Sequence, residues 1–178
     1  MLALAVAACP AAAGAKVFLS KEEALELAFP GAARVESRSV LLDAEQTKAV
    51  ETASRAKLET RIFTLHTGYA EDGAILGYAF IDTQVVRTLP EACLIVLSPQ
   101  GTVRTLRVLA FYEPEDYLPT DRWLGQFQGR ELSPDLAVDR GIQGIAGATL
   151  SAGAITSGVR RALAFYSFVI APQKVAGN

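Results

Sequence analysis

The sequence predicts an α+β domain in which a mostly antiparallel sheet of at least four strands is packed by N-terminal helices and a C-terminal helix. Three observations predict it. Two helical patterns lie near the N-terminus, and four strand patterns follow from about residue 60. One long apolar helical pattern then closes the chain after residue 150. Since strands joined by short turns pair antiparallel, we expect no doubly wound parallel sheet.

Chain length and composition limit what the protein can be. At 178 residues the chain suits a single domain, and with 20% charged residues and a net charge of -2 it is not expected to bind nucleic acid. The chain has one histidine, His66, and two cysteines, Cys9 and Cys93. These cannot build a four-ligand zinc site or a four-cysteine iron–sulfur cluster, so no metal site is expected. Both His66 and Cys93 lie in strand patterns and are expected to be structural.

Residues 1–15 have the pattern of an export signal. An apolar run ends in the small residues Ala13-Gly14-Ala15, a typical cleavage site, so we predict a signal peptide followed by one domain at residues 16–178. Val6-Ala7-Ala8-Cys9 is also similar to a lipobox, in which Cys9 carries a lipid anchor. Both alternatives predict a periplasmic or extracytoplasmic protein, either free or membrane-anchored. Neither leaves a second thiol to pair with Cys93.

The first part of the domain is predicted to be helix, strand, helix. Ser20 and Glu23 form the S-x-x-E pattern of a capping box, and the helix that it begins ends at Pro30. Residues 33–42 alternate as a strand. Asp43 then begins a second helix that runs to about Ser54.

Two predicted hairpins follow. The turn at Asp72-Gly73 joins the first pair of strands, and the turn Ser98-Pro99-Gln100-Gly101 joins the second. The predicted strands are residues 61–69, 75–82, 92–97 and 102–111.

The segment from residue 112 to residue 140 is predicted to be a long connection, because it contains three prolines, with one short helix at 121–127. Trp123 and Phe127 lie one helical turn apart there. They either stack on a ligand or anchor the segment to the core. The acidic stretch around Glu113 is expected to be a solvated loop.

The last helix is predicted beyond Ser151 and ends at Pro172. The run Gly144–Thr149, rich in glycine and alanine, lies directly before it. A helix N-terminus offers unpaired N–H groups and a partial positive charge, so this position suits a phosphate. The hydroxyls of Thr149 and Ser151 either cap the helix or face the phosphate. Further along the helix, Arg160 and Arg161 are expected to be solvated or paired with acids.

Gly147-Ala148-Thr149-Leu150-Ser151 resembles the motif of the FMN-binding domain family. That family includes the flavin-bearing subunits of the sodium-pumping NADH:quinone reductase and of the Rnf electron transport complex. In its motif S-G-A-T-x-T/S, a flavin transferase that uses FAD esterifies the FMN phosphate to the threonine. The resemblance therefore implies that Thr149 bears FMN, with Gly147, Ala148, Leu150 and Ser151 around it.

The resemblance covers roughly residues 60–170. In the family, the places that correspond to Glu113 and Trp123 help to enclose the isoalloxazine, so the resemblance implies the same for these two residues. Family members with covalent flavin usually have Asp six residues before the threonine and Ser or Thr three before it. This chain has Gln143 and Ala146 there. Covalent and noncovalent FMN therefore both stay open.

The resemblance implies an exported FMN flavoprotein that carries electrons in an extracytoplasmic or membrane-associated redox chain. The cofactor does this chemistry, so no acid–base pair of the protein is required. The implied partners are a flavin transferase and redox partner proteins or a membrane electron-transfer complex. Two alternatives remain, namely an exported binding module without flavin and a reductase with noncovalent FMN.

Overall fold

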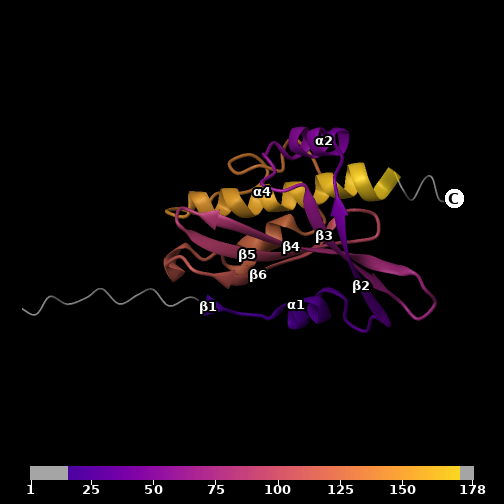
Figure 1. Ribbon diagram of the computed structural model, residues 1–178. Coiled ribbons are helices and arrows are strands. Elements are labelled where there is room, and N and C mark those ends of the chain that lie inside the picture. Colours follow the sequence, from indigo (N-terminus) through magenta and orange to yellow (C-terminus); the bar gives the residue numbers. More distant parts are fainter. Residues whose placement is uncertain (1–15, 173–178) are drawn as a thin grey trace, which may run out of the picture.

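The computed structural model describes residues 16–172, which form one six-stranded sheet (Figure 1). All neighbouring strands pair antiparallel, in the order β1-β6-β5-β4-β3-β2, which confirms the predicted fold class. The predicted signal peptide and Cys9 lie outside the described residues. The strands are β1 (Lys16–Val17), β2 (Arg34–Leu41), β3 (Ile62–Tyr69), β4 (Ile75–Val86), β5 (Leu89–Leu97) and β6 (Val103–Phe111).

The first three α-helices begin where the sequence predicts. Ser20 caps α1 through a complete capping box with Glu23, and Asp43 caps α2 in the same way with Gln46. The last helix, α4, begins slightly earlier than predicted, at Thr149. Helix bounds are α1 (Lys21–Ala28), α2 (Ala44–Ser54), α3 (Asp121–Leu124) and α4 (Thr149–Phe165), with short 3-10 turns at Glu115–Tyr117 and Gly125–Phe127 and a π-helical end at Tyr166–Ile170.

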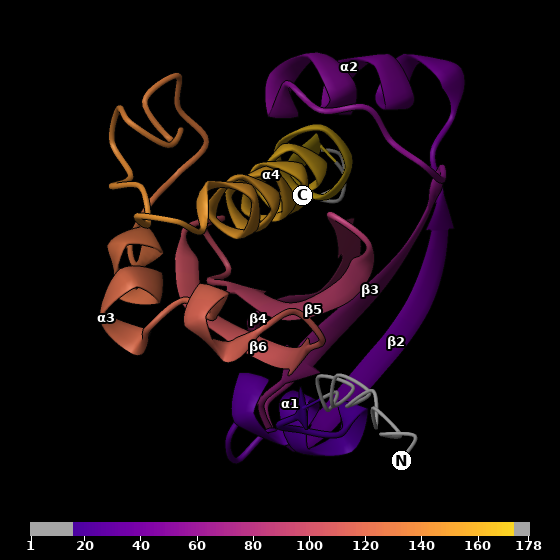
Figure 2. The ribbon, with the colours of Figure 1, turned by 90° about the vertical axis from the view of Figure 1, so that its left-hand side faces the viewer.

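The sheet separates two apolar clusters. Helix α4 lies on one face, with α2 outside it, and α1 covers the opposite face (Figure 2). Side chains of β5 alternate between the two faces of the sheet and so contribute to both clusters. Cys93 and Ile95 lie in the cluster under α4, whereas Leu94 and Val96 lie in the cluster under α1. Within residues 16–172 no helix has both the length and the apolar character to cross a bilayer.

Arg160 corrects one expectation. We expected a solvated or acid-paired side chain, but Arg160 is only 6% exposed and its guanidinium donates to four backbone carbonyls. Two of these end α2, where carbonyls lack helical partners. Arginine has enough N–H donors to satisfy all four. Arg160 therefore joins α4 to the end of α2 and to a distant loop. The acceptors belong to Ala53, Ser54, Ser133 and Leu136.

Candidate functional site

Helix α4 begins without a side-chain cap. Its N-cap is Ala148, and no side chain accepts a hydrogen bond from its first turn. By contrast Ser20, Asp43 and Thr120 cap the other three α-helices. The interpretation of Thr149 or Ser151 as a cap is therefore wrong. The 17-residue helix instead presents uncapped N–H groups and the positive end of its dipole.

The turn before α4 is open to an approaching group. Gly147 has φ +79°, a left-handed conformation that disfavours larger residues, and a Cβ built there would meet no atom within 4 Å. Ala148 is buried, but Thr149 is exposed and Leu150 is 54% exposed. Ser151 is only 2% exposed and turns toward the core. Of the five motif residues, Gly147, Thr149 and Leu150 thus form the accessible part.

Helix α3 lies beside this turn. Trp123 Nε1 donates to the Gln143 carbonyl at 2.6 Å, and the Gln143 N–H donates to Gln126 Oε1 at 2.8 Å. The Trp123 ring is only 7% exposed and contacts Phe127 edge-on, with 5.3 Å between ring centroids. The structure therefore favours anchoring over stacking for these two aromatic residues. It also brings the predicted site residue Trp123 to the segment that leads into α4.

Glu113 corrects a second expectation, because it is buried rather than solvated. It is 9% exposed, and its Oε1 has no hydrogen-bond partner within the described chain. Glu115 and Asp116 are exposed, as expected for that loop. A buried carboxyl oxygen without a partner costs free energy, so a hydrogen bond from a bound molecule or a buried water would stabilise it.

Glu91 is a second such residue, and the sequence reasoning missed it. It is 3% exposed, and its Oε2 also lacks a partner within residues 16–172. Burial raises the pKa of Glu91 to about 7, the hydrogen bond from Cys93 opposes the rise, and the charges of Asp82 and Glu113 add to it. Near neutral pH this carboxyl can therefore donate or accept. The sequence contained a signal for this burial. Glu91 lies two and four residues before the core residues Cys93 and Ile95, so its side chain is on the same face of β5.

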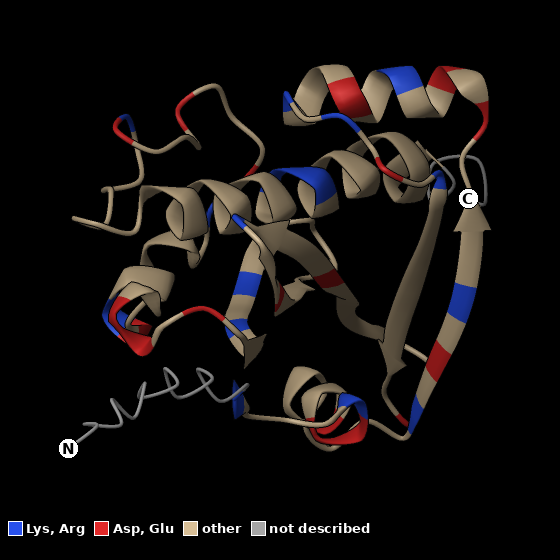
Figure 3. Ribbon diagram, turned by 60° about the vertical axis from the view of Figure 1, so that its left-hand side comes forward, with Lys and Arg blue, Asp and Glu red and all other residues tan. Residues whose placement is uncertain are grey.

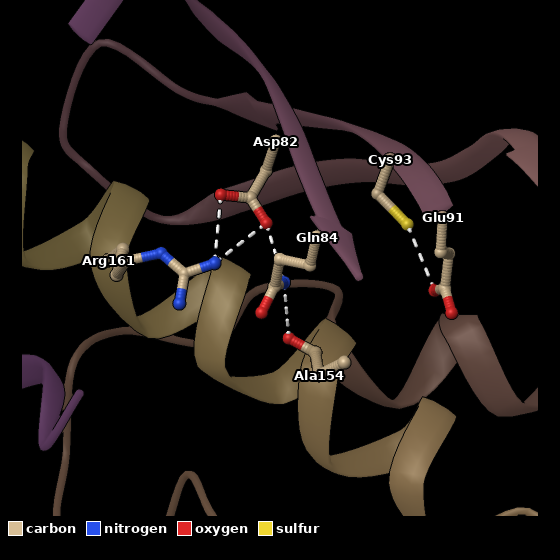
Figure 4. Close-up of polar contacts among 6 residues, drawn as sticks. All are labelled: Asp82, Gln84, Glu91, Cys93, Ala154 and Arg161. Carbon is tan, nitrogen blue, oxygen red and sulfur yellow. Dashed lines mark hydrogen bonds and ion pairs between the residues drawn. The ribbon is translucent and has the colours of Figure 1, made fainter. Parts of the chain in front are cut away.

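The strand register places Glu91 beneath the first turns of α4. Gln84 Nε2 donates to the Ala154 carbonyl at 2.7 Å, which holds α4 over β4, and Glu91 lies opposite Gln84 on β5. Figure 4 shows these side chains on the helix-facing side of both strands. Glu91 also pairs with Phe111 of β6, two residues before Glu113. The two orphaned carboxylates thus share one end of the sheet.

Cys93 and His66 are both buried in the core, as expected for residues of the strand patterns. Cys93 is a free buried thiol whose Sγ lies 3.5 Å from Glu91 Oε1, and burial raises its pKa. His66 is 1% exposed with Nδ1 2.6 Å from Ser37 Oγ, and burial lowers its pKa. In the described part of the chain, no three His, Cys, Asp or Glu side chains are arranged to hold a metal ion.

No family model matches the chain. A comparison with curated proteins also gives no match. The function must therefore be argued from the site. An uncapped helix end suits an anionic group, and two buried carboxyl groups nearby suit N–H or O–H donors.

Proposed function

We propose that this protein is an FMN-binding flavoprotein that carries electrons, with the FMN phosphate at the start of α4. The observation that carries the proposal is the uncapped N-terminus of α4 beside the accessible residues Gly147 and Thr149. Phosphate is stabilised by free N–H groups and by the positive end of a helix dipole. The resemblance of Gly147–Ser151 to the FMN-binding motif supports the same position.

The residues around the turn fit the remaining parts of FMN. Leu150 is exposed, so it offers an apolar contact for a ring, and Thr149 offers the hydroxyl on which a phosphate ester would form. The unpartnered oxygens of Glu91 and Glu113 would accept hydrogen bonds from ribityl hydroxyls or ring N–H groups. Bound FMN would supply electron transfer, while these residues orient it and exclude water.

A covalent ester suits the proposed location outside the cytoplasm. Where little free FMN surrounds the protein, mass action no longer retains a dissociable cofactor. An ester on Thr149 would remove that dependence. A flavin transferase is then a required partner, and redox proteins or a membrane electron-transfer complex would exchange electrons with the flavin.

Intact mass tests the proposal. The protein would be purified from a host that expresses a flavin transferase, beside Thr149→Ala and Ser157→Ala, a matched loss of a hydroxyl further along α4. We expect an added mass of FMN minus water on the wild type and on Ser157→Ala, and none on Thr149→Ala. The same added mass on Thr149→Ala would reject Thr149 as the attachment residue.

Colour separates the alternatives. Yellow protein that loses its colour on denaturation would show noncovalent FMN and reject the ester. Colourless protein without added mass, which also fails to quench FMN fluorescence in a titration, would reject the flavin proposal and leave an exported binding module.

A further inference from the structure

A separate cavity of about 250 Å³ lies between α4, strand β4 and the segment from residue 57 to residue 64. Polar and apolar side chains contribute about equally to its wall, and the Asp82–Arg161 ion pair lies within it. Gly158, Arg161 and Ala162 are the α4 residues that line the cavity. Gly158, the first of them, lies nine residues after Thr149, which is about 14 Å along the helix axis. The cavity is thus distinct from the start of α4. The main apolar residues that line it are Leu58, Phe63, Phe80, Ile95 and Ala162.

Arg161 has hydrogen-bonding capacity that the protein does not use. All its hydrogen bonds come from Nη2, which lies 2.9 Å from both Asp82 carboxylate oxygens. Within residues 16–172, its Nη1 and Nε have no protein partner, and neither atom is fully buried. The neighbouring Arg160, by contrast, uses Nε, Nη1 and Nη2 on backbone carbonyls. Arg160 is a structural anchor, whereas Arg161 presents free donors to the cavity.

Asp82 is held firmly against α4. Gln84 Nε2 donates to Asp82 Oδ2 at 2.7 Å and bridges to the helix (Figure 4). The helix has a glycine at the point of contact, where a Cβ on Gly158 would lie 2.5 Å from Asp82 Oδ2. A glycine inside a helix costs about 0.5–1 kcal/mol relative to alanine. Gly158 therefore lowers the stability of α4 at the position where the Asp82 carboxylate contacts the helix.

The charge of the pair limits the ligand. Asp82 and Arg161 neutralise each other, and Lys57 and Glu59 in the wall carry opposite charges. A carboxylate on Arg161 would therefore add an uncompensated negative charge to a partly buried site, which is costly. An uncharged acceptor such as a carbonyl oxygen can take the free Arg161 N–H groups without that cost. The two phenylalanines of the wall offer contact to an apolar ring, and the polar side chains of the wall suit a polar substituent on that ring.

We propose that this cavity binds a small, uncharged molecule that has an apolar ring and a carbonyl oxygen, and that this oxygen accepts hydrogen bonds from Arg161. The volume, below the roughly 300 Å³ of drug-sized pockets, suits a molecule about as large as one substituted aromatic ring. The site does not depend on flavin binding.

Three probes that share one ring test the proposal. Benzamide has the uncharged carbonyl, benzoate the charged one and toluene neither. Each would be titrated into ¹⁵N-labelled protein while the Arg161 Nε–H resonance is followed. We expect benzamide to shift that resonance saturably, and benzoate and toluene each to bind at least about tenfold more weakly. Tighter binding of benzoate would overturn the uncharged class, and the absence of a saturable shift with all three probes would overturn the site.

Three variants give the matched controls. Ala162→Leu fills the cavity and should abolish the benzamide shift, whereas Val85→Thr, exposed on β4 outside the cavity, should retain it. A benzamide shift that persists in Ala162→Leu would overturn the location. The double variant Asp82→Asn with Arg161→Gln removes both charges together, so neither is left unpaired. This variant lacks the Arg161 resonance, so binding to it is followed at the backbone N–H of Gly158, which also lines the cavity. It should bind benzamide no better than toluene, and a retained preference for benzamide would overturn the role of Arg161.

Discussion

Gly158 of α4 lies where Asp82 of β4 leaves no room for a side chain. A Cβ on Gly158 would lie 2.5 Å from Asp82 Oδ2 and 3.1 Å from Gln84 Nε2. The spacing between α4 and the sheet at this point is therefore set by a carboxylate and an amide that bond to the helix, and a larger residue at position 158 would have to displace one of them.

Gly158→Ala should destabilise the protein by about 1–3 kcal/mol, because the methyl group displaces Asp82 from Arg161. Gly153→Ala is the matched control on the same helix. A Cβ there meets nothing within 4 Å, so the change should stabilise by about 0.5–1 kcal/mol through helix propensity. Urea unfolding measures both. Equal stabilisation by the two alanines would contradict the crowding at Gly158.

Glu91 should make stability fall as pH rises from about 4.5 to about 7. Burial raises the folded pKa to about 7 from the ordinary 4.5, so across this window the folded state holds a proton that the unfolded state has lost. The contribution is fully present below the unfolded pKa. Its loss by pH 8 is on the order of 3 kcal/mol. Glu91→Gln, which does not ionise, should be less sensitive to pH in this window and more stable than the wild type at pH 8.

The control for this prediction is Glu26→Gln, the same change of charge at an exposed position of α1. Its free energy of unfolding should follow the wild-type curve from pH 5 to pH 8. Wild-type and Glu91→Gln curves that run parallel over this range would show that Glu91 ionises normally in the folded protein.

Arg160→Met should cost about 3 kcal/mol or more, because four carbonyls lose a charged donor and three segments lose their common anchor. Arg160→Lys keeps the charge but offers a single ammonium in place of the planar guanidinium, so an intermediate loss is expected. Thermal unfolding compares the three proteins. A change below about 1 kcal/mol for Arg160→Met would mean that water replaces the guanidinium at these carbonyls.

Trp123→Phe should loosen the segment before α4 while the sheet stays intact. The change removes the hydrogen bond to the Gln143 carbonyl and part of a buried ring. A loss of about 1–3 kcal/mol is expected. Hydrogen exchange should quicken in residues 143–148 and stay unchanged in β5. Unchanged exchange in both segments would indicate that the contact with Gln126 holds the segment by itself.

The sequence alone determined most of the elements and their order, but it missed the short strand β1 and the extension of β4 and β5 toward the turn that joins them. Capping residues at Ser20 and Asp43 and the turn at Asp72-Gly73 act over a few residues, so their structural consequence is readable without the fold. The glycine-rich entrance to α4 was readable for the same reason. These local patterns predicted the antiparallel α+β architecture that the structure shows.

Only the tertiary structure decided which polar side chains are buried and what they meet. Glu91 and Glu113 are far apart in sequence and are brought to one end of the sheet by the β5–β6 register. Arg160 and Arg161 are adjacent in sequence, yet helical geometry turns one toward backbone carbonyls and the other toward Asp82. Desolvation and hydrogen-bond satisfaction depend on every neighbouring element at once, and no local pattern contains that information.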